Sequence, residues 1–337
     1  MKAVGYRQSL PIEHSDSLID LDLPEPAQEE RDLLVAVHAV SVNPVDTKVR
    51  MRSQPESGHA KVLGWDAAGI VQAVGPAVKF FKPGDRVSYA GSIARPGTNS
   101  ELHVVDERIV GPMPASLSFA QAAALPLTAI TAWELLFERL AVPAAKRASQ
   151  DSLLVVGAGG GVGSILVQLA RKLTGLYVVG TAGRPETGRW LMDLGAHAVI
   201  DHRKPLAAQL KDIGCGQVTH VASLTHTDVH FTGIVESLAP QGKLALIDDP
   251  KSLDVGLLKQ KSLSLHWELM FTRSLFQTPD MEGQHRLLAD VAALVDAGVL
   301  RTTLSEHYGR ISAAGLKRAH ALIESGQARG KVVLEGF

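Results

Sequence analysis

The stretch that decides the fold reads LLVVGAGGGVGSILVQLARK, residues 153–172. Four apolar residues typical of a buried strand run into a glycine-rich turn, and the turn runs into an apolar stretch with helical spacing. Backbone without side chains can approach a pyrophosphate closely, and the N–H groups at the start of the following helix attract the anion. We therefore predict a dinucleotide-binding turn. The alternative is a glycine turn that only lets strand and helix pack closely.

The spacing of these glycines departs from the strict Gly-x-Gly-x-x-Gly pattern, because they fit better as Gly157-x-x-Gly160-x-x-Gly163. A variant turn must then meet the phosphates. The residues that we predict to bind the cofactor here are Gly157, Gly160, Gly161, Val162 and Gly163.

The end of the next predicted strand, 177–181, indicates which dinucleotide binds. In NAD-binding domains an acid at this point accepts hydrogen bonds from the adenosine 2′-hydroxyl, whereas this chain reads Gly-Thr-Ala-Gly-Arg at 180–184. Small residues leave room for a 2′-phosphate, and the Arg184 guanidinium can pair with it. We predict NADPH as the cofactor, with Thr181 and Arg184 beside it. A solvent-facing Arg184 at the start of a helix is the alternative.

The pattern of apolar, Pro and Gly residues along the chain changes near Pro126. Before it, short β-rich runs separated by Pro and Gly turns favour a barrel or sandwich. After it, unbroken apolar strands alternate with helices, which is typical of a parallel sheet covered by helices. The predicted strands are 33–37, 69–71, 86–89 and 102–105, then 153–156, 177–181, 198–201, 220–224 and 244–248. The predicted helices are 162–173, 186–194, 206–212 and 229–238. Two further helices, 286–297 and 314–325, and a last strand, 331–334, have a pattern that does not settle their domain.

The composition narrows the range of partners. The 34 Lys and Arg nearly balance the 35 Asp and Glu, so the formal charge of −1 offers no overall attraction to nucleic acid or an anionic membrane. Cys215, the only cysteine, excludes an intramolecular disulfide and a zinc site with two or more thiolates. The N-terminus lacks the apolar core of a signal peptide, and the most apolar later stretch is interrupted by Pro126. We expect a cytoplasmic protein with no nucleic-acid or membrane partner.

Several motifs together resemble the medium-chain dehydrogenase/reductase superfamily, in its zinc-independent quinone oxidoreductase branch. They are the glycine turn, ALPLTAITAWE at 124–134, SVNPVDTKVR at 41–50, KPGDRV at 82–87 and GKVVL at 330–334. The stretch WELMFTRS at 267–274 is similar to the subgroup labelled zinc-type alcohol dehydrogenase-like. The resemblance implies an α/β protein that forms a homodimer or homotetramer. It implies a GroES-like β-barrel catalytic domain from residues 1–126 and 277–337, and a Rossmann NADP-binding domain with a doubly wound parallel sheet from 127–276.

Zinc-dependent relatives carry a ligand cysteine where this chain has Asn43, and a Gly-His-Glu where it has Gly-Trp-Asp at 64–66. Trp65 cannot ligate a metal and Asn43 is a poor substitute for a thiolate, so we predict no metal site. His226 and His230 stand one helical turn apart without a third convergent ligand. We interpret them as an ordinary helix start capped by Thr225 or Thr227.

In metal-dependent enzymes, the metal ion acts as a Lewis acid and stabilises the alkoxide involved when a plain ketone is reduced. Without a metal, this stabilisation is lost. An activated acceptor, such as a quinone or an α,β-unsaturated carbonyl, accepts hydride at an electron-poor carbon. The negative charge then spreads to an oxygen distant from that carbon, where hydrogen bonds are enough to stabilise it. We therefore predict NADPH-dependent hydride transfer to such a small molecule. Two alternatives remain, a zinc-dependent alcohol dehydrogenase and a crystallin-like protein that binds NADPH without turnover.

The candidate catalytic residues come from the matched motifs. The resemblance places the amide of Asn43 near the nicotinamide. Lys48 stands where quinone reductases have a tyrosine, so its cation can polarise the acceptor oxygen, although this departure weakens the quinone assignment. Asp66 can hold water or orient Lys48, or it can be an interior carboxylate satisfied by backbone N–H groups. Tyr89 can donate to an oxygen or be a core residue.

Two further residues are candidates for cofactor contacts. Thr128 lies at the start of the helix between the domains, where a helix cap is the alternative. Lys331 matches the family's terminal glycine-lysine pair, where a surface lysine is the alternative. Asp46 and Arg50 can pair with each other across one helical turn. Four aromatic residues can line the binding site of the acceptor or pack in the core: Trp65, Trp267, Phe271 and Phe276.

Overall fold

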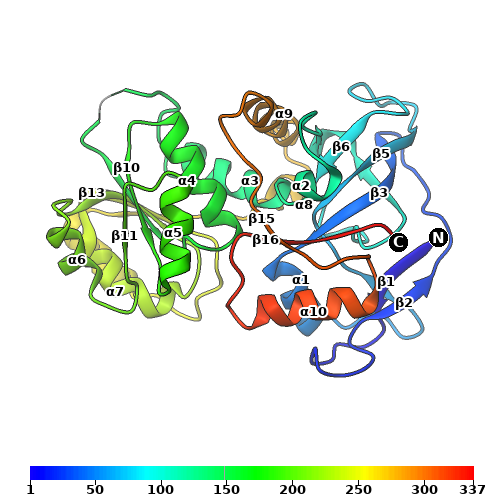
Figure 1. Ribbon diagram of the computed structural model, residues 1–337, viewed down its shortest axis with the longest axis horizontal. Helices are drawn as coiled ribbons and strands as arrows, with labels where there is room; N and C mark the ends of the chain where they lie inside the picture. The colour runs from blue at the N-terminus through cyan, green and yellow to red at the C-terminus, as the bar shows by residue number, and fades with distance from the viewer. Residues whose placement is uncertain (148) are drawn as a thin grey trace. The chain divides into compact units, whose positions relative to one another are not determined.

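The computed structural model describes residues 1–147 and 149–337, and they divide into two compact units. The first unit comprises Met1–Ile130 and Phe271–Phe337, and the second comprises Thr131–Met270. In Figure 1 the blue, cyan, orange and red segments belong mainly to the first unit, and the green and yellow segments mainly to the second. The sequence places these boundaries after residues 126 and 276, a few residues away.

The second unit is built on a parallel sheet whose six strands run in the order β11-β10-β9-β12-β13-β14. The strand order reverses between β9 and β12, and sheets of this kind bind ligands at such a point, beyond the carboxyl ends of the strands. The strands are β9 (Ser152–Val156), β10 (Tyr177–Thr181), β11 (Ala198–Ile200), β12 (Val218–Ser223), β13 (Leu238–Leu246) and β14 (Ser264–Trp267). Every strand predicted between 153 and 248 overlaps one of them.

Helices connect these strands, as the apolar periodicity predicts, and they appear beside the sheet in Figure 1. The core between them is aliphatic: fully buried Leu154, Val221 and Leu244 of the strands pack with Ile234 of a helix. The helices are α4 (Gly161–Leu173), α5 (Pro185–Asp193), α6 (Leu206–Asp212) and α7 (Thr227–Ser237), with a 3-10 helix η3 (Val255–Lys261) before β14. The sequence patterns did not predict η3 or β14.

The first unit is β-rich, with a three-stranded sheet, β2-β1-β4, and a seven-stranded sheet, β15-β16-β3-β5-β6-β8 with β7 on β3. The C-terminal tail belongs to this unit because β16 pairs antiparallel with β3. The strands are β1 (Lys2–Tyr6), β2 (Ile19–Asp22), β3 (Asp32–Val42), β4 (Lys61–Val62), β5 (Ala67–Val74), β6 (Arg86–Tyr89), β7 (Leu102–Asp106), β8 (Val110–Pro112), β15 (Leu304–His307) and β16 (Lys331–Glu335). The helices are α1 (Pro44–Arg52), η1 (Glu107–Ile109), α2 (Phe119–Ala123), α8 (Thr272–Phe276), α9 (Gly283–Asp296) and α10 (Ala313–Glu324).

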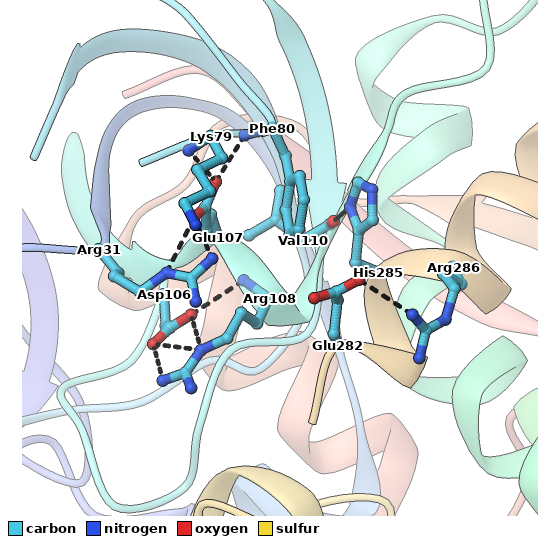
Figure 2. A network of polar contacts seen from close by, with 10 residues as sticks. All are labelled: Arg31, Lys79, Phe80, Asp106, Glu107, Arg108, Val110, Glu282, His285 and Arg286. Carbon is cyan, nitrogen blue, oxygen red and sulfur yellow. Dashed lines mark hydrogen bonds and ion pairs between the residues drawn. The ribbon is translucent and has the colours of Figure 1, made fainter. Parts of the chain in front are cut away.

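A buried carboxylate fixes one side of the first unit (Figure 2). The side chain of Glu107 is fully buried and accepts hydrogen bonds from the Arg31 guanidinium, at 2.5 and 3.0 Å, and from the backbone N–H groups of Lys79 and Phe80, at 2.8 and 2.7 Å. His285 of α9 stacks on the Phe80 ring with 4.5 Å between centroids. A buried carboxylate is stable only with such partners, so this network holds η1, the 79–80 loop and α9 together.

After α2 the chain continues as α3 (Pro126–Trp133), which runs directly into η2 (Glu134–Arg139), a turn with π-helical hydrogen bonding. By length and composition, the helical stretch Phe119–Arg139 is the one place in the described chain that could cross a membrane. However, 83% of its most apolar window is buried inside the protein, as in the core helix of a globular domain.

Candidate active site

The glycine turn lies at the carboxyl end of β9, beside the reversal of strand order. Gly157 adopts a positive φ of 80°, and α4 begins at Gly161 with Gly160 as its N-cap. No side chain caps this helix, and the N–H groups of its first turn have no acceptor within the helix. Those N–H groups belong to the predicted cofactor residues Gly161, Val162 and Gly163.

Of the three glycines in the Gly157-x-x-Gly160-x-x-Gly163 pattern, two are required by packing and one is not. A Cβ on Gly163 would lie 2.3 Å from the Ala158 carbonyl oxygen, and a Cβ on Gly157 would lie 2.8 Å from Thr225 Cγ2. A Cβ on Gly160 would meet only the Gly157 carbonyl oxygen, at 3.7 Å, which is ordinary contact. Close packing therefore explains Gly157 and Gly163 but not Gly160. A ligand that approaches the backbone would explain the third glycine.

Thr181 and Arg184, which the sequence places beside the cofactor, have different surroundings. Thr181 is 2% exposed and its Oγ1 accepts the backbone N–H of Gly157 at 3.1 Å, so it fixes the turn. Arg184 precedes α5, is 44% exposed at its side chain and lies 3.5 Å from a Glu186 oxygen. The first acid after β11, Asp201, is bound by the Arg203 guanidinium through both of its oxygens.

The start of α7 differs from the prediction. His226 is itself the N-cap, with a left-handed φ of 50°, and neither Thr225 nor Thr227 has that role. Instead, the Asp248 carboxylate accepts hydrogen bonds from the backbone N–H and the hydroxyl of Thr227, at 2.8 and 2.5 Å. Desolvation lowers the pKa of His230. Within residues 1–147 and 149–337, no group of three His, Cys, Asp or Glu side chains could hold a metal ion.

Four buried polar residues of the first unit converge: Asn43, Asp46, Asp66 and Lys331, each at most 2% exposed. Lys331 Nζ lies 2.8 Å from Asp66 Oδ2 and also donates to Asn43 Oδ1. Asn43 Nδ2 donates to Asp66 Oδ2 at 2.8 Å, and the Asn43 backbone N–H donates to Asp46 Oδ2 at 2.6 Å. The other oxygen of Asp66 accepts the N–H of Leu127, in the first turn of α3, at 2.8 Å. This set is hereafter called the buried cluster.

The contacts in the buried cluster bear on the alternatives that the sequence left open for Asp66 and Lys331. The ammonium that contacts Asp66 is that of Lys331, where the sequence suggested Lys48. Burial raises the pKa of Asp66, and the charge of Lys331 opposes that shift. Burial also raises the pKa of Asp46 to about 7, and the hydrogen bond from the Asn43 backbone opposes that shift. Lys331 is buried, which argues against the surface-lysine alternative.

Tyr89 is fully buried, and its hydroxyl lies 3.1 Å from His103 Nδ1. His103 Nε2 lies 3.0 Å from the Pro96 carbonyl oxygen, which can only accept. Therefore Nε2 carries the ring proton and the Tyr89 hydroxyl donates to Nδ1. Desolvation raises the pKa of Tyr89 and lowers that of His103 to about 4. These contacts favour the core alternative for Tyr89.

Lys48 lies on α1 and lines an open pocket of about 360 Å³ together with Met51 and residues 11–13. The expected pair between Asp46 and Arg50 does not form. Arg50 is instead bound to Glu324 of α10 and to the Leu10 carbonyl oxygen. A helix turn brings Arg50 to the face that packs on α10, so its partner comes from a distant segment.

Thr128 and the aromatic candidates divide between core and surface. Thr128 Oγ1 donates to the Leu125 carbonyl oxygen at 3.0 Å, a local bond from inside the helix and not an N-cap, in which the hydroxyl oxygen would accept a backbone N–H. Trp65 is 1% exposed, donates its indole N–H to the Ser92 carbonyl oxygen and meets the Phe271 ring edge-on, at 6.2 Å between centroids. Two others are exposed: Trp267 by 54% and Phe276 by 75%.

Sequence reasoning missed a buried pair of acids in the second unit. Glu134 of η2 and Glu268 are 1% and 2% exposed, and Arg139 Nε lies 2.7 Å from Glu268 Oε2. Burial first, and then the charge of Glu134 and a hydrogen bond with it, raise the pKa of Glu268 to about 8. The available signal was an acid within an otherwise apolar run, AITAWELLF and LHWELMF.

Two family models match the chain. One, described as alcohol dehydrogenase GroES-like domain, matches residues 29–121, and one, described as zinc-binding dehydrogenase, matches residues 194–334. A zinc-type alcohol dehydrogenase-like protein of Staphylococcus aureus is 35% identical over 336 residues, which cover 99% of each chain. The chain belongs to the medium-chain dehydrogenase/reductase superfamily.

Solved structures of this superfamily resemble the chain over its whole length. A candidate zinc-dependent alcohol dehydrogenase from Rhizobium etli is 58% identical, with a TM-score of 0.95 over 100% of this chain and 98% of that one. The Escherichia coli quinone oxidoreductase, solved as a complex with NADPH, is 27% identical, with a TM-score of 0.84 over 99% and 100%. The predicted combination of a GroES-like domain and a Rossmann domain is thereby confirmed.

The residues of this dehydrogenase/reductase do not fit the zinc that some of these names imply. Zinc in proteins is held by thiolates, imidazoles and carboxylates. At the positions in question, Trp65 offers only an N–H that is already bonded to a carbonyl oxygen. Asn43 Oδ1 and Asp66 Oδ2 accept from the Lys331 ammonium, and Asp66 Oδ1 accepts the Leu127 N–H.

Proposed function

We propose that the chain is an NADPH-dependent, zinc-independent oxidoreductase that transfers hydride to an activated acceptor, such as a quinone or an α,β-unsaturated carbonyl. The observation that carries the cofactor assignment is the open space at Gly160, on a turn in which packing explains Gly157 and Gly163. The uncapped first turn of α4 supports pyrophosphate binding. Arg184, and the lack of an acid at 182–184, support NADPH over NADH, as does the E. coli neighbour solved with NADPH.

When bound, NADPH supplies a hydride from its nicotinamide ring. The chain's own residues bind and orient, and they set the charge around the reacting groups. The donor set at Asn43 and Asp66 does not suit zinc, so these two positions provide no zinc with which to polarise a plain ketone. This favours an acceptor that already has an electron-poor carbon and needs only a hydrogen bond at its oxygen.

Lys48 is our candidate for the group that meets the acceptor oxygen. It lies on the helix whose N-cap is Asn43, and it lines an open pocket. A cation near that oxygen would stabilise the negative charge that develops there after hydride transfer. Tyr89, the other candidate donor, directs its proton to His103 and is fully buried.

The proposal is tested by following NADPH and NADH oxidation with quinones, enals, plain ketones and aldehydes. We expect saturable turnover with a quinone or an enal, a preference for NADPH and little turnover of plain ketones. Saturable NADPH binding without oxidation in the presence of any acceptor would instead indicate the crystallin-like alternative.

The zinc-dependent alcohol dehydrogenase remains the second candidate, because the matched family model and several relatives carry zinc in their names. Metal analysis of the purified protein separates the two. Stoichiometric zinc, whose removal abolishes activity and whose return restores it, would exclude a zinc-independent enzyme. Our proposal also includes a cytoplasmic homodimer or homotetramer, which cell fractionation and sedimentation would check.

A further inference from the structure

Three oxygens surround the ammonium of Lys331. They are Asp66 Oδ2 at 2.8 Å, the Val42 carbonyl oxygen at 3.3 Å and Asn43 Oδ1. The carbonyl ends β3, Asn43 caps α1 and Asp66 precedes β5, whereas Lys331 comes from β16. A carboxylate, an amide and a backbone carbonyl are also the oxygen ligands that proteins offer to hard cations.

The site is closed to other partners. Lys331 has three ammonium protons, and each of the three oxygens can accept one. The Asp66 carboxyl group faces this ammonium directly, Asp46 also interacts with its charge, and the second Asp66 oxygen is bonded to the Leu127 N–H. At 2% exposure, Lys331 is shielded from bulk water, which could otherwise replace these bonds. Burial of a charged pair is costly unless every donor and acceptor is satisfied, and this arrangement meets that condition.

We propose that these three oxygens form a cation-binding cage whose permanent occupant is the tethered ammonium of Lys331. The ligand class of the cage is a primary alkylammonium, and Lys331 is a positioning residue that holds the Asn43 amide and the Asp66 carboxylate in place. The binding part stands independently of the proposed reduction. Only its effect on turnover rests on the proposed function.

The experiment empties the cage and refills it. Lys331→Ala deletes Cγ, Cδ, Cε and Nζ, and n-propylammonium has the same three carbons and one ammonium. We expect the melting temperature of Lys331→Ala to fall below that of the full-length wild type and to rise by at least about 3 °C with saturating n-propylammonium. 1-Propanol, of equal length without charge, is expected to give no such rise. Lys317→Ala, which removes a surface lysine of α10 from the same unit, is the matched control and is expected not to respond.

A second variant keeps the packing and removes only the charge. Lys331→Met is expected to melt below wild type because it leaves the Asp66 carboxylate buried without its cation, and Lys331→Met/Asp66→Asn is expected to regain part of the loss. The cage proposal is overturned by equal responses to amine and alcohol, or by a Lys331→Met protein as stable as wild type. If Lys331→Ala folds only during refolding with n-propylammonium, and not with 1-propanol, that result supports the cage.

Turnover provides a separate readout. If the wild type reduces an acceptor, Lys331→Ala is expected to lower kcat at least tenfold with the Kd for NADPH within about threefold of wild type, and n-propylammonium is expected to restore part of kcat. A parallel loss of NADPH affinity would assign Lys331 to the cofactor instead and overturn the positioning role. A wild type that reduces nothing would refute the proposed function, while the melting experiments would still decide on the cage.

Discussion

Substitution of Gly160 by alanine separates cofactor binding from folding. Gly160 has φ −76° and ψ −176°, which any residue adopts, and its added Cβ would meet only one atom, at 3.7 Å. Alanine is a poorer N-cap than glycine, so we expect the free energy of unfolding to fall by no more than about 1 kcal/mol. The new methyl group would extend into the open space where we place the pyrophosphate.

The expected loss of NADPH affinity follows from the contacts at risk. A phosphate that accepts from the first-turn N–H groups of α4 makes charge-assisted hydrogen bonds worth about 1.5–3 kcal/mol each. Displacement of one such bond raises the Kd for NADPH by about 10- to 100-fold. Gly163→Ala has the opposite profile, because its Cβ would lie 2.3 Å from the Ala158 carbonyl oxygen and the strand and helix must move apart.

The assay pairs calorimetric titration with NADPH and urea unfolding, for wild type, Gly160→Ala and Gly163→Ala. We expect Gly160→Ala to lose affinity with nearly unchanged stability, and Gly163→Ala to lose stability by more than about 1 kcal/mol. Wild-type NADPH affinity in a folded Gly160→Ala protein would refute the reasoning, because the phosphates could not then lie against this turn.

Three further predictions concern single side chains. Arg184→Ala is expected to weaken NADPH binding by up to about tenfold and NADH binding hardly at all, since Arg184 is partly exposed and near Glu186; equal effects on the two Kd values would remove its 2′-phosphate role. Lys48→Ala is expected to lower turnover more than NADPH affinity, and steady-state rates equal to wild type would remove Lys48 from the chemistry. The pKa of Glu268, raised to about 8, lies above the ordinary carboxyl value, so the folded protein holds a proton that the unfolded chain releases. The contribution of Glu268 to the free energy of unfolding should therefore fall as pH rises from about 4.5 to about 8, by at most about 1.4 kcal/mol per pH unit for this proton. Glu268→Gln should change the slope measured by denaturant titration and leave the contributions of the other buried groups, including Asp46 and Asp66, and an unchanged slope would count against the buried acid pair.

The sequence predicted the features that depend on local pattern. The second unit's strands and helices alternate with a clear period, and the glycine turn sits between the first strand and the first helix, where such turns bind phosphate. Its positive φ at Gly157 and the contact at Gly163 are consequences of that local geometry. These relations involve residues a few positions apart, so they can be inferred from the chain alone.

The sequence could not predict partners that come from distant segments. Asp66 and Lys331 are 265 positions apart, and Arg50 and Glu324 are 274 apart. Because helix spacing suggests the nearest opposite charge, Asp46 was expected to pair with Arg50, while packing of α1 against α10 supplied Glu324 instead. Pairing of this kind is decided by which strands and helices meet, and only the tertiary structure contains that information.

The late position of β16 has a consequence for synthesis. Residues 331–335 are translated after both the N-terminal strands and the middle unit, yet residues 332–335 pair with residues 39–42 of β3 and Lys331 brings its ammonium to Asp66. The middle unit has its complete sequence available earlier and can fold while the N-terminal strands still lack this partner. During translation the N-terminal portion therefore carries a sheet with an unpaired strand edge and a carboxylate without its counter-ion, and an unpaired edge of this kind favours association with other chains.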